Sequence, residues 1–212
     1  MHIVVTAGPT REYIDDVRFV SNPSSGRMGF CIAAEAAGRG HDVRLLTGPV
    51  CLDIPSGVEV SRFETVEELY ALACAALEDA DCLVMAAAPG DYRPASRIAG
   101  KHKKQPSFAL ELVATRDVLA SLAVRKADRI FVGFAVETND ALENARKKIQ
   151  AKSLDFIVLN TPASFGRDRA DFTFVFPGGR TRPLGTVAKT DVAAAILNEV
   201  EIMFHQDNPR EV

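Results

Sequence analysis

The sequence predicts an α/β fold of the Rossmann-like, doubly wound type, with a mostly parallel sheet and a small antiparallel dimerisation extension. Two observations predict it. Short apolar runs that read as strands alternate along the chain with segments of helical pattern. The strand candidates are almost continuously apolar, as in sheets covered by helices on both faces. With 212 residues the chain has the length of one domain, so we take residues 1–212 as a single domain.

The regular elements follow from local patterns. Thr65 with Glu68 three residues later forms a capping-box pattern, and the glycines at 38 and 40 mark the end of an alanine-rich helix. The expected strands are 2–7, 42–47, 82–88, 129–137 and 154–160. The expected helices are 25–40, 65–80, 115–126, 139–152 and 186–204.

Two segments break this alternation and are the expected antiparallel extension. Residues 107–113 alternate between apolar and polar side chains, as a half-solvated strand does. Residues 171–184 read as a hairpin with a Pro-Gly-Gly turn. Such pieces cover a subunit interface or form a solvated edge, and the pattern leaves both open.

Composition excludes several classes of function. The net charge of −3 gives no basic field for nucleic acid, and no apolar run reaches the roughly 18 residues of a membrane span. The first residues run directly into a strand, without the pattern of a secretory signal. We therefore expect a cytoplasmic protein that binds neither nucleic acid nor membrane.

The stretch SNPSSGRMG, residues 21–29, stands where a nucleotide-binding fold keeps its phosphate loop. Gly8 ends the first strand in small residues, and Ser24, Ser25 and Gly26 precede the next helix. Backbone N–H groups at a helix N-terminus, with two hydroxyls, make an anion site to which Arg18 and Arg27 could add charge. The structural alternative is that a serine only caps the helix and that Asn22-Pro23 is turn chemistry.

Three further stretches follow strand ends or glycines. Asp91 follows the 82–88 strand and suits a ribose hydroxyl or Mg²⁺, or else a helix N-cap. Phe134 suits a nucleotide base or the core. The loop GKHKKQ carries Lys101, Lys103 and Lys104, which could close on a triphosphate or form a solvated face. Neither a P-loop nor G-x-S-x-G occurs, which favours activation of an anionic substrate over hydrolysis by a triad.

Taken in order, five motifs closely resemble phosphopantothenoylcysteine synthetase, an enzyme family of coenzyme A biosynthesis. They are TAGPTREYIDDVRFVSNPSSGRMG, AAAPGDYRP, GKHKK, VGFAVET with NARKK, and LDFIVLN, and they span nearly the whole chain. The family commonly has Val-Ala where Pro89-Gly90 stand, and often an asparagine where Ala170 stands. In many bacteria the enzyme is the C-terminal half of a fusion with a flavin-dependent decarboxylase.

The resemblance implies a homodimeric ligase that joins phosphopantothenate to L-cysteine. The substrate carboxylate attacks the α-phosphate of a nucleoside triphosphate, giving an acyl-nucleotide and pyrophosphate. The cysteine amine then releases the nucleoside monophosphate. CTP is the expected co-substrate and ATP the alternative, with Mg²⁺ or Mn²⁺ as the metal and no flavin. A separate or fused flavin-dependent decarboxylase is a possible partner.

The resemblance also implies roles for individual residues. Asn22 matches the asparagine that holds the acyl-nucleotide, and Lys101 matches the lysine of a mobile loop; these two are the expected catalytic residues. Arg18, Ala87 and Ala88 match substrate contacts across the dimer interface, together with Asn22. The expected nucleotide contacts are Gly8, Ser24, Ser25, Gly26, Asp91, Lys101, Lys103, Lys104 and Phe134, with Asp91 also as metal ligand.

Two other functions remain open from the sequence. An NAD(P)-dependent oxidoreductase would use the same fold, although the first turn lacks G-x-G-x-x-G. A non-catalytic nucleotide-binding protein would bind nucleotide without releasing pyrophosphate.

Overall fold

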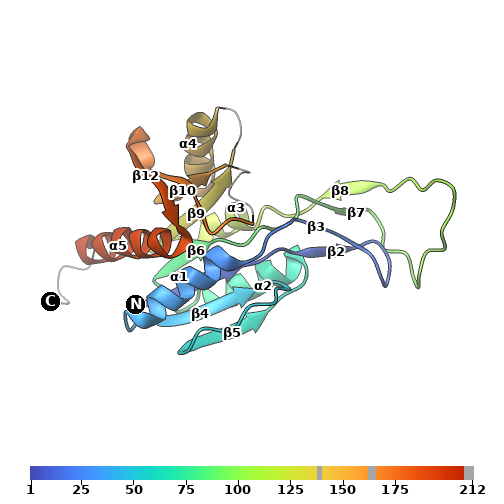
Figure 1. The fold of residues 1–212 in the computed structure, drawn as a ribbon, viewed down its shortest axis with the longest axis horizontal. Helices are drawn as coiled ribbons and strands as arrows, with labels where there is room; N and C mark the ends of the chain where they lie inside the picture. Colours follow the sequence, from blue (N-terminus) through green and yellow to red (C-terminus); the bar gives the residue numbers. More distant parts are fainter. Residues whose placement is uncertain (138–139, 162–165, 208–212) are drawn as a thin grey trace.

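The computed structural model describes residues 1–137, 140–161 and 166–207 and contains an eight-stranded sheet (Figure 1). Six neighbouring strands are parallel, and their order in space is β5-β4-β1-β6-β9-β10. This is the strand order of the Rossmann fold, so the expected fold class is confirmed. The parallel strands are β1 (His2–Ala7), β4 (Asp42–Thr47), β5 (Val58–Arg62), β6 (Cys82–Met85), β9 (Ile130–Val136) and β10 (Phe156–Asn160).

Helices cover both faces of the sheet, which explains why the central strands are apolar throughout. On one face α1 (Arg27–Gly38) and α5 (Lys189–Asp207) pack side by side, with Ile32 and Ile196 fully buried. The opposite face carries α2 (Val66–Ala76), α3 (Val118–Leu122) and α4 (Ala141–Lys152). The short η1 (Ala123–Arg125) continues α3. Each face thus has its own hydrophobic core.

The expected hairpin at 171–184 is confirmed, with longer strands than the pattern indicates. β11 (Arg169–Val175) pairs antiparallel with both β10 and β12 (Thr181–Ala188), and the turn contains η3 (Pro177–Gly179). The hairpin therefore extends the main sheet. Phe172 and Phe174 anchor it in the core beside α5.

A separate antiparallel arm, which contains β2, β3, β7 and β8, projects from one side of the main sheet (Figure 1). β2 (Arg11–Tyr13) pairs with β3 (Phe19–Ser21), and β7 (Tyr92–Pro94) pairs with β8 (Leu112–Ala114). The strand expected at 107–113 is wrong for most of its length, because strand pairing starts only at Leu112. The Glu111 carbonyl still accepts the N–H of Ala95 at 3.0 Å, but residues 107–110 belong to no strand in the part of the chain that the structure describes.

Three other elements differ from the expectation, one by its absence from it and two in their boundaries. β5 was not predicted, because this edge strand is short, half exposed and contains Glu59 and Ser61. The strand expected at 82–88 ends at Met85, and its last residues form a loop. The helix expected from residue 186 begins at Lys189, because residues up to Ala188 pair with β11.

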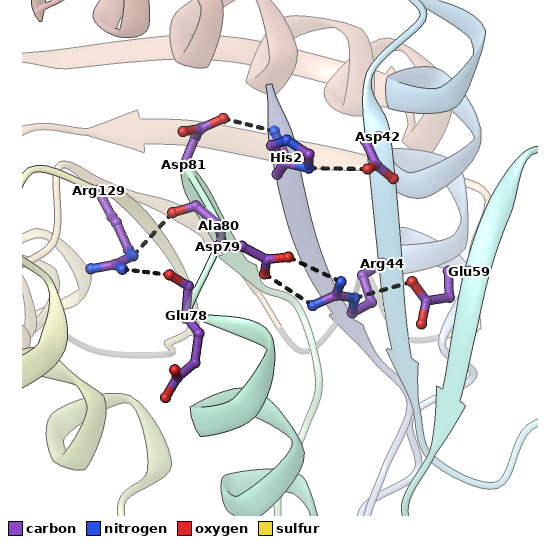
Figure 2. Close-up of polar contacts among 9 residues, drawn as sticks. All are labelled: His2, Asp42, Arg44, Glu59, Glu78, Asp79, Ala80, Asp81 and Arg129. Carbon is purple, nitrogen blue, oxygen red and sulfur yellow. Dashed lines mark hydrogen bonds and ion pairs between the residues drawn. The ribbon is translucent and has the colours of Figure 1, made fainter.

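Charged side chains join the amino ends of the parallel strands (Figure 2). The backbone N–H of His2 donates to Asp81 at 2.7 Å, and its ring lies 3.0 Å from Asp42. Arg44 bridges Glu59 and Asp79, both at 3.2 Å. Exposed pairs of this kind contribute about 0–1 kcal/mol each. This edge is therefore a structural one, and the opposite, carboxyl edge is where ligands bind in such sheets.

Within the described residues, no helix combines the length and the apolar character needed to cross a bilayer.

Candidate functional site

A cavity of about 330 Å³ lies at the carboxyl edge of the sheet, where the strand order reverses between β1 and β6. This is the place where doubly wound sheets bind ligands. Segments that are distant in the sequence meet there. Its lining residues are Pro23, Ser24, Ser25, Gly26, Arg27, Met28, Ala86, Ala87, Ala88, Pro89, Asp91, Phe134, Ala135, Val136, Lys148, Asn160, Gly166 and Lys189.

The N-terminus of α1 opens into this cavity without a side-chain cap. The N-cap residue is Gly26, with φ 75° and no side-chain hydrogen bond to the first turn, so the interpretation of Ser24 or Ser25 as N-cap is wrong. Within the described residues, Ser24 Oγ accepts only the N–H of Gly26 itself, at 3.4 Å. The first intrahelical bond runs from Phe30 N–H to Gly26 O, which leaves the N–H groups before it for a ligand. Uncapped N–H groups and the helix dipole favour an anion here.

Tight packing explains why α1 starts at this point. A Cβ on Gly29 would lie 2.6 Å from the Cβ of Ala7 and 2.7 Å from the carbonyl oxygen of Thr6. Only glycine lets the first turn of α1 pack directly on the end of β1. Gly8 faces Gly26 in the same contact, where a Cβ on Gly26 would meet the Gly8 backbone at 3.4 Å. Gly8 therefore packs against the start of α1 and does not itself line the cavity.

The loop after β6 is held against the loop after β1 by hydrogen bonds. Thr6 Oγ1 accepts the N–H of Ala87 at 3.0 Å, and the carbonyl of Gly8 accepts the N–H of Ala88 at 2.9 Å. Asn22 Nδ2 donates to the carbonyls of Ala88 at 3.3 Å and Pro89 at 2.9 Å. Asn22 therefore lies at the junction of the two loops, and its amide must give up one of these carbonyls to donate to a ligand.

Asp91 and Phe134 stand between this cavity and a neighbouring one of about 190 Å³, because both residues line both. Asp91 precedes β7 and its carbonyl accepts the N–H of Thr115 at 2.9 Å, so the helix N-cap interpretation is wrong. The second cavity also contains Arg116 and Lys152. Two adjoining cavities, lined by several cations and by the carboxylates of Asp91 and Asp117, suit an extended anion such as a nucleotide.

The donor set limits how a metal could be held. Among the described residues, no group of three or more His, Cys, Asp or Glu side chains could hold an ion. Asp91 is the carboxylate of the cavity lining. Mg²⁺ is commonly bound by one or two carboxylates together with substrate phosphates and water, and Asp91 fits that mode.

Lys148 lines the cavity and is a residue that sequence reasoning did not assign. It comes from α4, where Nζ lies 2.6 Å from Glu137 Oε1. Lys148 lowers the pKa of Glu137, with a further contribution from Asn144 and an opposing one from burial. The pair holds the lysine ammonium group in the lining of the cavity. The NARKK motif at residues 144–148 includes this lysine, but which of its three basic residues faces the site depends on how α4 packs.

Arg27 and Lys189 line the cavity next to α5, with Asp168 beside them. Arg27 pairs with Asp168, and Lys189 donates to the carbonyl of Arg167. Burial lowers the pKa of Lys189, although Asp168 opposes the shift. The same three residues border a larger open cavity of about 620 Å³ between α1, residues 52–55 and α5.

Arg18 and the three lysines of the 101–104 loop lie outside these cavities. Arg18 is at the turn between β2 and β3, and Lys101, Lys103 and Lys104 are exposed in the connection between β7 and β8. Figure 1 shows this connection at the far end of the arm, away from the ends of β9 and β10. A single chain thus brings together Asn22, Ser24, Ser25, Gly26, Ala87, Ala88, Asp91 and Phe134. It leaves Arg18 and the lysines apart from them.

With this geometry in view, comparison with known proteins identifies the family. The family model of the DNA/pantothenate metabolism flavoprotein C-terminal domain matches residues 1–203. The chain belongs to this family. The assignment confirms the resemblance that the five ordered motifs indicate.

Several curated relatives are named as bifunctional proteins of coenzyme A biosynthesis. The coenzyme A biosynthesis bifunctional protein CoaBC of Bacillus subtilis is 40% identical over 215 residues, covering 99% of this chain and 53% of the relative. The protein of the same name from Escherichia coli is 37% identical over 220 residues, covering 99% of this chain and 54% of the relative. The chain spans about half the length of these relatives.

Solved structures give the same fold. The crystal structure of the C-terminal domain of CoaBC superposes with a TM-score of 0.85 at 33% identity, covering 97% of this chain and 96% of that one. A mutant of Cab2 in complex with phosphopantothenate-cysteine superposes with a TM-score of 0.80 at 15% identity, covering 98% and 89%. The second likeness shows the fold alone.

Proposed function

We propose that the protein is a ligase that joins phosphopantothenate to L-cysteine through an acyl-nucleotide, as a step of coenzyme A biosynthesis. One observation carries the proposal: in a member of this family, the uncapped N-terminus of α1 and Asp91 line one cavity at the strand reversal, and Asn22 donates to two carbonyls of the loop that also lines it. The CoaBC relatives and their solved C-terminal domain support the choice of reaction.

The first half-reaction needs a bound triphosphate and a carboxylate nucleophile. The N–H groups of α1, with Ser24 and Ser25, would hold phosphate oxygens, and Lys148 and Arg27 add positive charge around the cavity. The substrate carboxylate attacks the α-phosphorus, forming an acyl-phosphate bond and expelling pyrophosphate. Mg²⁺ held by Asp91 and the phosphates would neutralise part of the negative charge.

The second half-reaction is attack of the cysteine amine on the acyl carbon. An amide bond forms, the nucleoside monophosphate leaves, and the amine loses a proton. Asn22 would act here, because its amide nitrogen lies at the junction of the two loops and could exchange the Ala88 carbonyl for the acyl oxygen. A donor aimed at the developing oxyanion lowers the barrier. Ala87 and Ala88, with no side chain beyond Cβ, leave room for the acyl group.

CTP is the proposed co-substrate, with ATP as the alternative. The base would lie near Phe134, in or beside the second cavity. Pro89 and Gly90 form part of the lining of this second cavity. Thr10 Oγ1 holds their backbone in place by accepting the N–H of Gly90 at 2.9 Å. A change in this segment would alter the pocket in which the base is selected.

A homodimer would complete the site, because Arg18 and Lys101 lie on the arm and not beside the cavity. The arm exposes large apolar side chains that a second copy of the chain would cover. Those exposed by 40% or more are Val17, Phe19, Tyr92, Phe108 and Leu112. We propose that the arms of two chains pair and present Arg18 and Lys101 to the cavity of the other copy.

Pyrophosphate release tests the proposal most directly. The assay contains phosphopantothenate, L-cysteine, magnesium and either CTP or ATP, with phosphopantothenate omitted as control. Release that depends on the acid with CTP is the expected result. Acid-dependent release only with ATP keeps the ligase and reverses the nucleotide assignment. Nucleotide binding without release with either would overturn the ligase in favour of a binding protein.

A further inference from the structure

The turn between β2 and β3 contains a fully buried carboxylate that the proposed chemistry does not use. Asp15 has no exposed surface, and it lies on the arm close to Arg18. A buried charge is costly unless it is paired and hydrogen-bonded, so its partners indicate why it is there.

The two oxygens of Asp15 have different partners. Oδ1 accepts the backbone N–H groups of Val17 at 2.8 Å and Arg18 at 2.7 Å, which closes the turn itself. Oδ2 accepts the N–H of His102 at 3.0 Å and lies 3.3 Å from Arg18 Nη1. One oxygen thus holds the local turn, and the other holds His102 of the lysine loop, 87 residues further along the chain.

Further bonds join the same two segments. Arg18 Nη2 donates to the carbonyl of His102 at 2.9 Å. Asp16 exchanges two bonds with Gly100, through its N–H at 3.3 Å and its Oδ2 at 3.0 Å. The residues on either side of Lys101 are therefore both fixed to the β2–β3 turn, while the Lys101 side chain remains exposed.

The groups around the Asp15 carboxyl stabilise its ionised form. Burial alone would raise the pKa of Asp15, but the N–H groups of Val17, Arg18 and His102 and the charge of Arg18 outweigh it, so the pKa is lowered. Asp15 is ionised at neutral pH, and hydrogen bonds to an ionised acceptor belong to the stronger class.

We propose that Asp15 is a positioning residue that fixes Lys101 relative to Arg18, so that the two cations of the arm move as one unit. The inference rests on the proposed function, in which Lys101 meets the nucleotide and Arg18 the substrate phosphate. With both fixed to one turn, docking of the arm would place both charges at once. The entropic cost of ordering the loop is then incurred once, when the protein folds, and not again in each catalytic cycle.

Asp15→Asn tests this selectively. The asparagine Oδ1 can still accept from Val17 and Arg18, whereas its NH₂ would face two donors, His102 N–H and Arg18. The controls are Lys101→Gln, which removes the charge but keeps the anchor, and Asp79→Asn, which loses a carboxylate at the opposite edge of the sheet. Two readouts are compared: hydrogen exchange of residues 97–106 and pyrophosphate release.

We expect the loop amides of Asp15→Asn to exchange about tenfold faster than those of the wild type, with no change in Lys101→Gln or Asp79→Asn. Pyrophosphate release should slow in Asp15→Asn and Lys101→Gln but not in Asp79→Asn. The double variant Asp15→Asn/Lys101→Gln should be no slower than Lys101→Gln, because Asp15 acts through Lys101.

Three outcomes would count against the inference or its basis. Unchanged loop exchange in a folded Asp15→Asn overturns the anchor. Faster exchange with normal pyrophosphate release, while Lys101→Gln is slow, overturns the positioning role. If Lys101→Gln releases pyrophosphate at the normal rate, Lys101 has no role in the proposed function. The hydrogen exchange of Asp15→Asn then still tests whether Asp15 anchors the loop. If Asp15→Asn does not fold, Asp16→Ala replaces it, because alanine removes the oxygen that accepts the Gly100 N–H, and unchanged exchange at Gly100 then overturns the anchoring of the loop by this turn.

Discussion

The amide nitrogen of Asn22 lies 2.9 Å from the carbonyl oxygen of Pro89 and joins the two loops that line the candidate site. One loop leads from the arm into α1, and the other follows β6. An asparagine can bridge two carbonyls because its NH₂ group has two hydrogens and no charge. Replacing the amide by a carboxylate would oppose both carbonyls with negative charge.

We expect Asn22→Asp to stop the second half-reaction while the first continues, so that acyl-nucleotide accumulates. The carboxylate cannot donate to the acyl oxygen, whereas the phosphate contacts of α1 are unaffected. Chromatography of quenched reactions measures the intermediate. Ser21→Ala is the control, because within the described residues Ser21 Oγ bonds only backbone carbonyls, that of Thr10 at 2.6 Å and that of Asn22 at 3.4 Å, and not the Asn22 amide. Normal turnover of Asn22→Asp would remove Asn22 from the mechanism.

Lys148→Gln should weaken nucleotide binding about tenfold, since one positive charge is lost beside the phosphates. Its neighbour Lys147 provides a matched control. Lys147 pairs with Glu143 on the exposed side of α4 and is 68% exposed, so Lys147→Gln should bind normally. Titration calorimetry with CTP compares the two variants. Equal affinity in both would show that Lys148 does not contact the nucleotide.

Gly26→Ala should destabilise the protein by about 1–2 kcal/mol, because an L-residue with a side chain is strained at the φ of 75° found here. The added Cβ would also lie 3.1 Å from Val50 Cγ1. Gly38→Ala at the other end of α1 is the control. It has open space around it and should be neutral or stabilising by up to about 1 kcal/mol. Urea denaturation measures both, and equal stability would contradict the strain at Gly26.

Leu112→Asp should convert the proposed dimer to a monomer and abolish most of the activity together. Leu112 is 42% exposed on β8 of the arm, and a carboxylate buried in an apolar interface is unfavourable. Light scattering after size exclusion gives the mass. Val124→Asp, at a residue 89% exposed on η1, should leave mass and activity unchanged. An active monomer of Leu112→Asp would disprove a site shared between two copies.

Local chemistry in the sequence was enough for several elements. Thr65 caps α2 with the full capping box, because that motif involves only residues within one turn. The strands β1, β4 and β9 were predicted within one residue, because burial on both faces demands continuous apolar side chains. β5 escaped prediction, since a half-exposed edge strand is recognised only through its neighbour β4.

The amino-acid sequence by itself determined the fold class, the family and the identity of several residues that line the cavity or adjoin it. Asn22, Ser24, Gly26 and Asp91 carry recognisable motifs because backbone geometry and charge at a strand end restrict which residues fit. Only the tertiary structure decided that Lys148 points at the cavity and that Arg18 and Lys101 do not lie beside it. The physical reason is that both facts depend on contacts between segments distant in sequence: the packing of α4 against the sheet, and the anchoring of the lysine loop by Asp15.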